Sequence, residues 1–232
     1  MFVLVQQSEY ANHRTLLGKM FELRDRIVPD DHGQNAPFDA RDGRDRFDDI
    51  GPAYLIWCDG GYEVLYGSLR LLPTTGPTRA GDVSRRICLP DLDLCHPSIW
   101  EGTHLCIDAA AIEADMPEIG PSAAVVHMLV ALAECALAEG ISALVTDYEP
   151  QLASVFLQTG APLSEVGRIG DGGSRQVCCG LFGIDRVVVD TMHANTGLSG
   201  LYCSSPRRSL PETPSMFEHA LEDEKLRTSN IN

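Results

Sequence analysis

Hydrophobic positions along the chain switch between two periods, which predicts alternating strands and helices. Residues 2–5 form a short apolar run typical of a strand. Residues 16–23 repeat Leu, Met and Phe at helical spacing, and Pro29 ends that helix. Two further strands, over residues 53–58 and 62–72, flank Asp59-Gly60-Gly61, a strong hairpin signal.

The second half of the chain continues the alternation. We expect strands over residues 103–107, 143–145 and 176–184, and helices from Pro121 to Glu139, stopped by Gly140, and over residues 151–158. This order predicts one α/β domain over residues 1–203, with a mixed twisted central sheet flanked by helices. The tail, residues 204–232, is rich in Pro, Ser and charge, and we expect it to be disordered.

Two stretches have no periodic pattern. Residues 30–52 are rich in Asp, Arg and Gly, and residues 74–99 contain several Pro. Both predict long loops, which are often functional when ordered.

Composition limits the classes of function. A formal net charge of −15 argues against nucleic acid as a partner, because phosphate binding needs a basic surface. No apolar run approaches a membrane span, and the start of the chain lacks a signal-peptide pattern, so we expect no membrane association. The eight cysteines follow no metal-ligand spacing. This predicts no metal site and a reduced, cytoplasmic protein.

Charged side chains stand on two of the apolar strands. Arg70 lies between Leu69 and Leu71, and Glu101 follows Trp100. Such charges are costly unless they are paired or used, so they indicate a half-buried polar site between neighbouring strands. Glu101 fits a general base whose pKa is raised by burial, or a carboxylate paired with Arg70. The sequence leaves both interpretations open.

Other charged residues also have two interpretations. Asp45 and Asp48 are candidate ligand-binding carboxylates, but Asp is also common as a turn or capping residue. Arg24 and Arg26 are candidate site residues or charges that complement the end of a helix. No glycine-rich phosphate loop stands between residue 107 and Pro121.

The ordered motifs resemble the acyl-homoserine-lactone synthases, the LuxI-type autoinducer synthases, over roughly residues 1 to 185. The resemblance is carried by Leu23-Arg24-Asp25-Arg26, Asp45-Arg46-Phe47-Asp48, Arg70-Leu-Leu-Pro-Thr-Thr-Gly-Pro77 and Glu101-Gly-Thr103. It implies a GNAT-like three-layer sandwich. It also implies an enzyme that transfers the acyl group of an acyl carrier protein to S-adenosylmethionine, closes the lactone and releases methylthioadenosine. S-adenosylmethionine would be a substrate, and the enzyme would hold no permanently bound cofactor.

The resemblance and the chemistry of this reaction together imply roles for individual residues. Glu101 would be the base, Thr103 would lie at the thioester, and Arg70 would orient carboxylates. Arg24, Asp45, Asp48 and His104 would hold S-adenosylmethionine. An apolar slot against the Pro121 helix, lined by Leu129, Leu144, Val145 and Thr146, would take the acyl chain.

Three positions depart from the family pattern: Val28, Gln34 and His104 stand where an aromatic residue, a tryptophan and an arginine are expected. Phe38, Phe47 or Trp57 could replace the missing aromatic walls. Three hypotheses therefore stay open: the lactone synthase, an N-acyltransferase with another amine acceptor, and a non-catalytic relative that binds acyl groups or carrier protein. Two sets of arginines could dock the acidic carrier protein or be ordinary surface residues: Arg79, Arg85 and Arg86, or Arg168 and Arg175.

Overall fold

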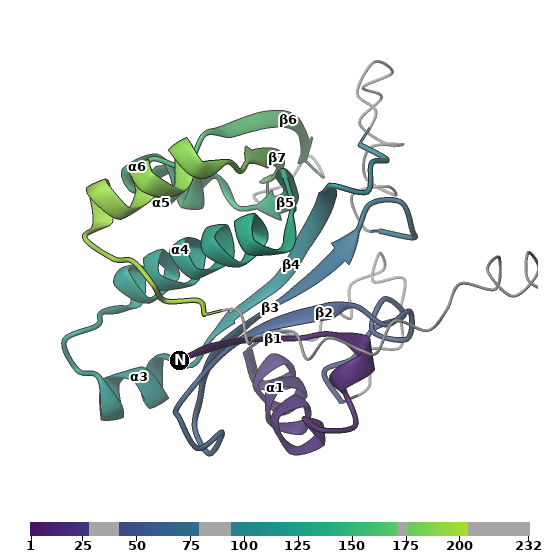
Figure 1. Cartoon of the computed structure of the whole chain (residues 1–232), viewed down its shortest axis with the longest axis vertical. Helices are drawn as coiled ribbons and strands as arrows, with labels where there is room; N and C mark the ends of the chain where they lie inside the picture. Colours follow the sequence, from purple (N-terminus) through teal and green to yellow (C-terminus); the bar gives the residue numbers. More distant parts are fainter. Residues whose placement is uncertain (28–41, 79–93, 171–175, 204–232) are drawn as a thin grey trace, which may run out of the picture.

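A seven-stranded mixed sheet carries helices on both of its faces in the computed structural model, which describes residues 1–27, 42–78, 94–170 and 176–203. The strand order is β1-β2-β3-β4-β5-β7-β6, and neighbours are antiparallel except for the parallel pair β4 and β5. Helix α1 covers one face, and α4, α5 and α6 lie together on the other (Figure 1). The expected three-layer α/β sandwich, with a mixed central sheet flanked by helices, is confirmed (Figure 1).

The strands are β1 (Phe2–Val5), β2 (Ala53–Cys58), β3 (Leu65–Pro73), β4 (Ile99–Ile107), β5 (Ala143–Tyr148), β6 (Leu163–Gly170) and β7 (Gln176–Gly183). The helices are α1 (Arg14–Ile27), α3 (Ala109–Asp115), α4 (Pro121–Glu139), α5 (Ala153–Thr159) and α6 (Arg186–Thr196), with short 3-10 turns η1 (Gln7–Glu9) and η2 (Pro150–Leu152).

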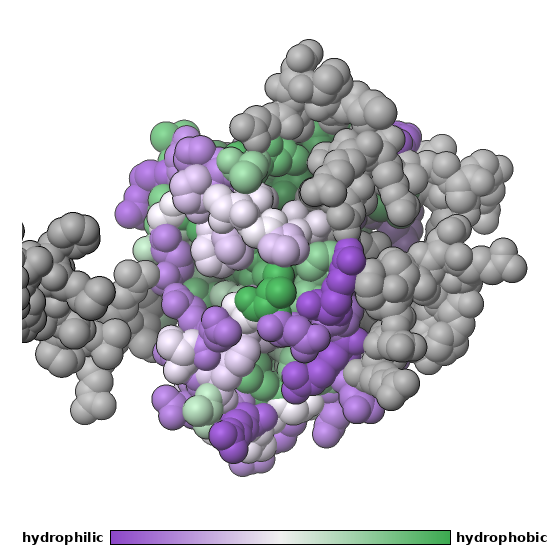
Figure 2. Space-filling model, turned by 90° about the vertical axis from the view of Figure 1, so that its right-hand side faces the viewer, coloured by the Kyte–Doolittle hydropathy of each residue, from purple (hydrophilic) through white to green (hydrophobic). Residues whose placement is uncertain are grey.

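Each face of the sheet has its own apolar core, because side chains alternate along the strands. Tyr54 and Ile56 of β2 face α1 and pack with Met20, whereas Leu55 and Trp57 pack in the larger core beneath α4. Figure 2 shows another side of the molecule, where hydrophobic residues lie in the centre beside a band of strongly hydrophilic ones. The two cores fix which strand residues can meet at one site.

The sequence predicts α4 at its observed bounds. Pro121 occupies the first turn, and Gly140 ends the helix in the left-handed conformation with φ 75°. The expectation that no apolar run approaches a membrane span needs correction, since α4 is long and apolar enough for one. More than half of its most apolar stretch is nevertheless buried inside the protein, as in the core helix of a soluble protein.

The predicted hairpin forms, but its turn is longer than expected. The side chain of Asp59 accepts hydrogen bonds from the backbone N–H groups of Gly61, Glu63 and Val64, and Tyr62 has φ 60°. These bonds hold the chain out of the sheet until Leu65, so β3 starts three residues later than predicted.

Strands β4 and β5 separate soon after they begin. They pair only over Ile99–Glu101 and Ala143–Val145, yet β4 continues to Ile107 and β5 to Tyr148. Glu101 and Val145, a register pair, therefore stand at the point of divergence, and beyond them the two strands share no ladder.

Candidate functional site

Four charged residues meet on the α1 face of the sheet, and we call them the Arg–Asp cluster: Arg24, Asp45, Asp48 and Arg70. Arg24 comes from the last turn of α1, and its Nη1 donates to both carboxylate oxygens of Asp48 at 2.9 Å. Both side chains are almost completely buried, at 3% and 0% exposure. The pair ties the end of α1 to the segment that precedes β2.

Arg70 forms the second half of the Arg–Asp cluster. This residue of β3 is fully buried. Its guanidinium donates to both carboxylate oxygens of Asp45: Nη1 bonds to Oδ1, and Nη2 bonds to Oδ2 at 3.1 Å. Nη1 also lies 3.1 Å from Oδ1 of Asp48, and Nε donates to Thr103 Oγ1 at 3.1 Å. Arg70 thus joins both carboxylates to β4.

His104 completes the surroundings of Asp45. Its Nε2 lies 2.9 Å from Asp45 Oδ2, and its backbone has φ 53°. The two carboxylate oxygens of Asp45 are therefore held by Arg70 and His104, and Oδ1 also accepts from the backbone N–H of Phe47 at 2.8 Å.

The charges of the site set its protonation states. Burial alone would raise the pKa of the Asp45 carboxyl, but hydrogen bonds from His104 and Arg70 outweigh burial and hold that pKa far below its usual range. Burial lowers the pKa of His104, and Asp45 opposes this only in part. At neutral pH the site therefore holds an ionised Asp45 beside a neutral imidazole.

The two carboxylates, both expected to hold a cationic ligand, are not equivalent in their contacts and exposure. Asp48 is enclosed: it accepts from Arg24, from the Tyr54 hydroxyl at 2.8 Å and from the backbone N–H of Asp45 at 2.8 Å. A carboxylate so filled has little capacity left for a ligand. The Asp45 side chain keeps 16% exposure and can face one.

Arg24 has unused donors. Among the described residues, its buried Nε and Nη2 have no hydrogen-bond acceptor. Burying such donors without partners is costly, so a ligand with an oxygen acceptor would recover that cost.

Glu101 lies on the same face of the sheet as Thr103 and Arg70. It is 1% exposed and stands opposite Leu72 of β3, two register pairs along from Arg70 and Thr103. The register therefore places it next to the cluster and at the point where β4 and β5 separate.

The four residues that we expected to line one acyl slot do not all lie on the same face of the sheet. Leu129 and Leu144 pack together in the core beneath α4, whereas Val145 belongs to a small cluster with Cys179. Alternation along β5 is the reason: Val145 faces the Glu101 side, and Thr146 returns to the Leu144 side.

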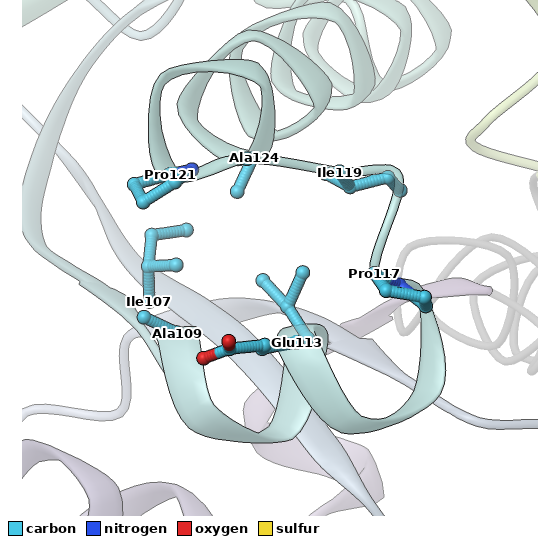
Figure 3. Close-up of a pocket in the computed structure, with 9 residues that line it drawn as sticks. Ile107, Ala109, Glu113, Pro117, Ile119, Pro121 and Ala124 are labelled. Atoms are coloured by element: carbon cyan, nitrogen blue, oxygen red, sulfur yellow. The ribbon is translucent and has the colours of Figure 1, made fainter.

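A separate pocket of about 250 Å³ opens between α3 and the first turn of α4. Ile107, Ile119 and Ala124 point into it, and Glu113 of α3 lies at its margin (Figure 3). No Lys or Arg is among its lining residues. The sequence did not indicate this pocket.

Several predicted residues lie outside the described part of the chain: Val28, Gln34, Phe38, Arg79, Arg85, Arg86, Arg175 and the tail. Trp57 was a wrong candidate for the ligand wall, because it stacks on Phe2 and His127 on the α4 face. Phe47 fits better, since it is 3% exposed and its ring lies 5.4 Å from the guanidinium carbon of Arg70. Arg168 forms a 2.8 Å ion pair with Glu165 on the surface.

Sequence reasoning missed Tyr54 and Gly43. Tyr54 pairs with Arg70 across the sheet, which requires the strand register to be known. Gly43 has φ 71°, and a Cβ there would meet the Phe21 carbonyl oxygen at 2.2 Å. Its position in a polar loop gave the one available signal, because such close approaches require glycine.

The chain matches a family model described as autoinducer synthase over residues 8–192. An acyl-homoserine-lactone synthase from Rhizobium etli is 33% identical over 150 residues, which cover 63% of this chain and 68% of that protein. One from Agrobacterium fabrum is 23% identical over 164 residues, covering 70% and 76%.

Solved structures show the same fold. The CoA-dependent synthase BjaI, solved with MTA, aligns with a TM-score of 0.71 at 22% identity, over 87% of this chain and 91% of that chain. The synthase LasI aligns with a TM-score of 0.68 at 22% identity, over 84% and 95%.

Proposed function

We propose a substrate pair for this chain, which belongs to the autoinducer synthase family and is an acyltransferase that makes acyl-homoserine lactones. The acceptor is S-adenosylmethionine and the donor is an acylated acyl carrier protein. The observation that carries the proposal is the arrangement of the Arg–Asp cluster beside Glu101, where β4 and β5 separate.

The acceptor lies over the Arg–Asp cluster. S-adenosylmethionine has a carboxylate, an ammonium and a sulfonium, so it needs both a cation and an anion. The unused Nε and Nη2 of Arg24 suit the carboxylate, and the partly exposed Asp45 suits the cationic groups. Asp48 and Tyr54 hold Arg24 and Arg70 in place and stay out of contact with the ligand. A structure of BjaI with SAM and isopentyl-CoA supports this acceptor class.

Glu101 is the general base of the acyl transfer. An α-ammonium must lose a proton before its nitrogen can attack, and a buried carboxylate next to the site can take it directly or through water. The freed nitrogen attacks the thioester carbonyl, the new amide bond forms, and the carrier thiolate leaves with a proton. Backbone N–H groups near Thr103, on the part of β4 that no longer pairs with β5, would stabilise the oxyanion.

Lactone closure depends more on how the substrate is positioned than on a further catalytic group. The substrate carboxylate oxygen attacks the carbon bonded to the sulfonium sulfur, the C–S bond breaks, and methylthioadenosine leaves with the electron pair. Because the attack is intramolecular, an Arg24 that holds the curled methionine chain supplies much of the rate.

The acyl chain passes between the diverging strands. Val145, in register with Glu101, lies beside the reacting end, and Leu144, Leu129 and Thr146 border the chain on the α4 face.

Charge favours a carrier protein over coenzyme A as the donor. No Lys or Arg lies between Arg86 and Arg168, a region that includes α3, α4 and the pocket between them. The phosphates of coenzyme A would meet no Lys or Arg among the residues that line this pocket. We also place the enzyme in the cytoplasm. The seven described cysteines are free, which is consistent with a reducing compartment.

Substitution of Glu101 by Gln tests the assignment of the base. We expect Glu101→Gln to lower turnover about 10²- to 10⁴-fold while binding of S-adenosylmethionine and the unfolding midpoint stay unchanged. Glu113→Gln, which alters an exposed carboxylate on α3, is the matched control and should retain activity. Turnover of Glu101→Gln close to that of the control would remove Glu101 from the mechanism.

A further inference from the structure

The ladder between β3 and β4 contains one extra residue on the β4 side. Arg70 pairs with Thr103, and Ser68 pairs with Cys106, so His104 and Leu105 together oppose Leu69 alone. His104 has φ 53°, a left-handed conformation that glycine adopts at much lower cost. This is the geometry of a β-bulge, a feature that changes the direction of side chains near functional sites.

The bulge brings two consecutive side chains to one site. In a regular strand Thr103 and His104 would point to opposite faces of the sheet. Here Thr103 Oγ1 accepts from Arg70 and His104 Nε2 bonds to Asp45, both on the α1 face. Leu105 then packs against the core beneath α4, and Cys106 returns to the α1 core.

The left-handed backbone at residue 104 does not by itself explain why a histidine stands there. Glycine would satisfy the left-handed conformation without strain, so the side chain of His104 must be judged by its contacts. Its bond reaches Asp45, which lies in the segment before β2 and faces the open side of the Arg–Asp cluster. Arg70 and His104 thus hold the Asp45 carboxylate from two adjacent strands, which fixes its rotation as well as its position.

We propose that His104 is a positioning residue for the acceptor: the β4 bulge aims its imidazole at Asp45 and holds that carboxylate toward the cationic groups of S-adenosylmethionine. This rests on the proposed function, because it assumes that acceptor. Burial keeps the imidazole neutral, so it orients Asp45 without cancelling its charge.

Two substitutions separate the side chain from the bulge. His104→Gly keeps the left-handed backbone and removes the imidazole. His104→Gln restores a donor that can reach Asp45, because its amide nitrogen is as many bonds from the backbone as the Nε2 atom that makes this contact. Tyr62→Gly is the matched control, since Tyr62 has φ 60° in the β2–β3 turn, away from the cluster.

The experiment measures calorimetric binding of S-adenosylmethionine to the full chain, with the thermal midpoint and kcat recorded for each variant. We expect His104→Gly to keep its midpoint, to weaken binding about ten- to a hundredfold, and to raise KM more than it lowers kcat. His104→Gln should recover most of the affinity, and Tyr62→Gly should bind as the wild type does.

Two results would overturn the inference: unchanged affinity in His104→Gly, or weakened affinity in His104→Gly that His104→Gln fails to restore. Failure of the proposed function would look different, because the wild-type chain itself would then not bind S-adenosylmethionine.

Discussion

The two aspartates of the Arg–Asp cluster differ in how far their side chains are exposed. Asp45 and Asp48 are three positions apart and both ionic, yet Asp48 is closed by Arg24, Tyr54 and a backbone N–H, whereas Asp45 keeps exposure on one side. The sequence indicated both as candidate site residues but could not distinguish between them. The difference comes from the strand register that sets Tyr54 opposite Arg70.

At the residue scale, His104 should make stability depend on pH. Its pKa in the folded protein lies below 6.5, the ordinary value, so between those two values the unfolded chain binds more protons. The free energy of unfolding therefore rises with pH through this window and falls on acidification. We expect the wild type to lose more stability than His104→Gln between about pH 7.5 and about pH 5, measured by urea denaturation at each pH. Equal losses would contradict this account of His104.

At the scale of elements, the sequence predicts long periodic segments well and short ones poorly. The predicted α1, α4 and β7 are confirmed, because their apolar stripes or runs are long. Helix α3 went unpredicted, since seven residues with one buried side chain give no clear period. In α6 three consecutive valines favour a strand, yet Asp185 caps a helix by accepting from Val188 N–H.

The sequence also did not predict strand β6, because its apolar positions are few and interrupted by glycine. The bulge in β4 was equally hidden, because a histidine in place of glycine removes the usual signal. Local sequence therefore indicated which charged residues to examine as candidates for a site, and pairing between strands decided what each one contacts.

The segment that follows α6 returns to α4, where the side chain of Glu134 accepts hydrogen bonds from it. Its carboxylate accepts from His193 Nε2 at 2.8 Å and from the backbone N–H groups of Gly200 and Tyr202 at 2.6 and 2.8 Å. We expect Glu134→Gln to lower the free energy of unfolding by about 1–3 kcal/mol, because three donors lose a charged acceptor. Urea denaturation beside the exposed Glu113→Gln control measures this. A loss no larger than that of the control would show that the segment is held by other contacts.

At the scale of the whole molecule, charge is distributed unevenly. The stretch without Lys or Arg between Arg86 and Arg168 includes α3, α4, β5 and α5, while the described basic residues before it lie in α1, in the segment before β2 and in β3. An acidic donor protein would be repelled by the first region, which limits its approach to the side that carries α1.

This distribution predicts the donor. With matched acyl groups, we expect kcat/KM for the acylated carrier protein to exceed that for the acyl-coenzyme A by about tenfold or more, and to fall as salt is raised. Steady-state kinetics with both donors over a salt series measure this. A preference for acyl-coenzyme A, as in the CoA-dependent relative BjaI, would reverse the donor assignment and leave the acceptor site unaffected.

The most direct test of the account is a single reaction of the purified chain with S-adenosylmethionine and an acylated carrier protein, analysed by mass spectrometry. We predict acyl-homoserine lactone and methylthioadenosine in equal amounts, both reduced about 10²-fold or more in Glu101→Gln. Acylated carrier protein that is consumed without release of methylthioadenosine, or an acylated product of another amine, would contradict it.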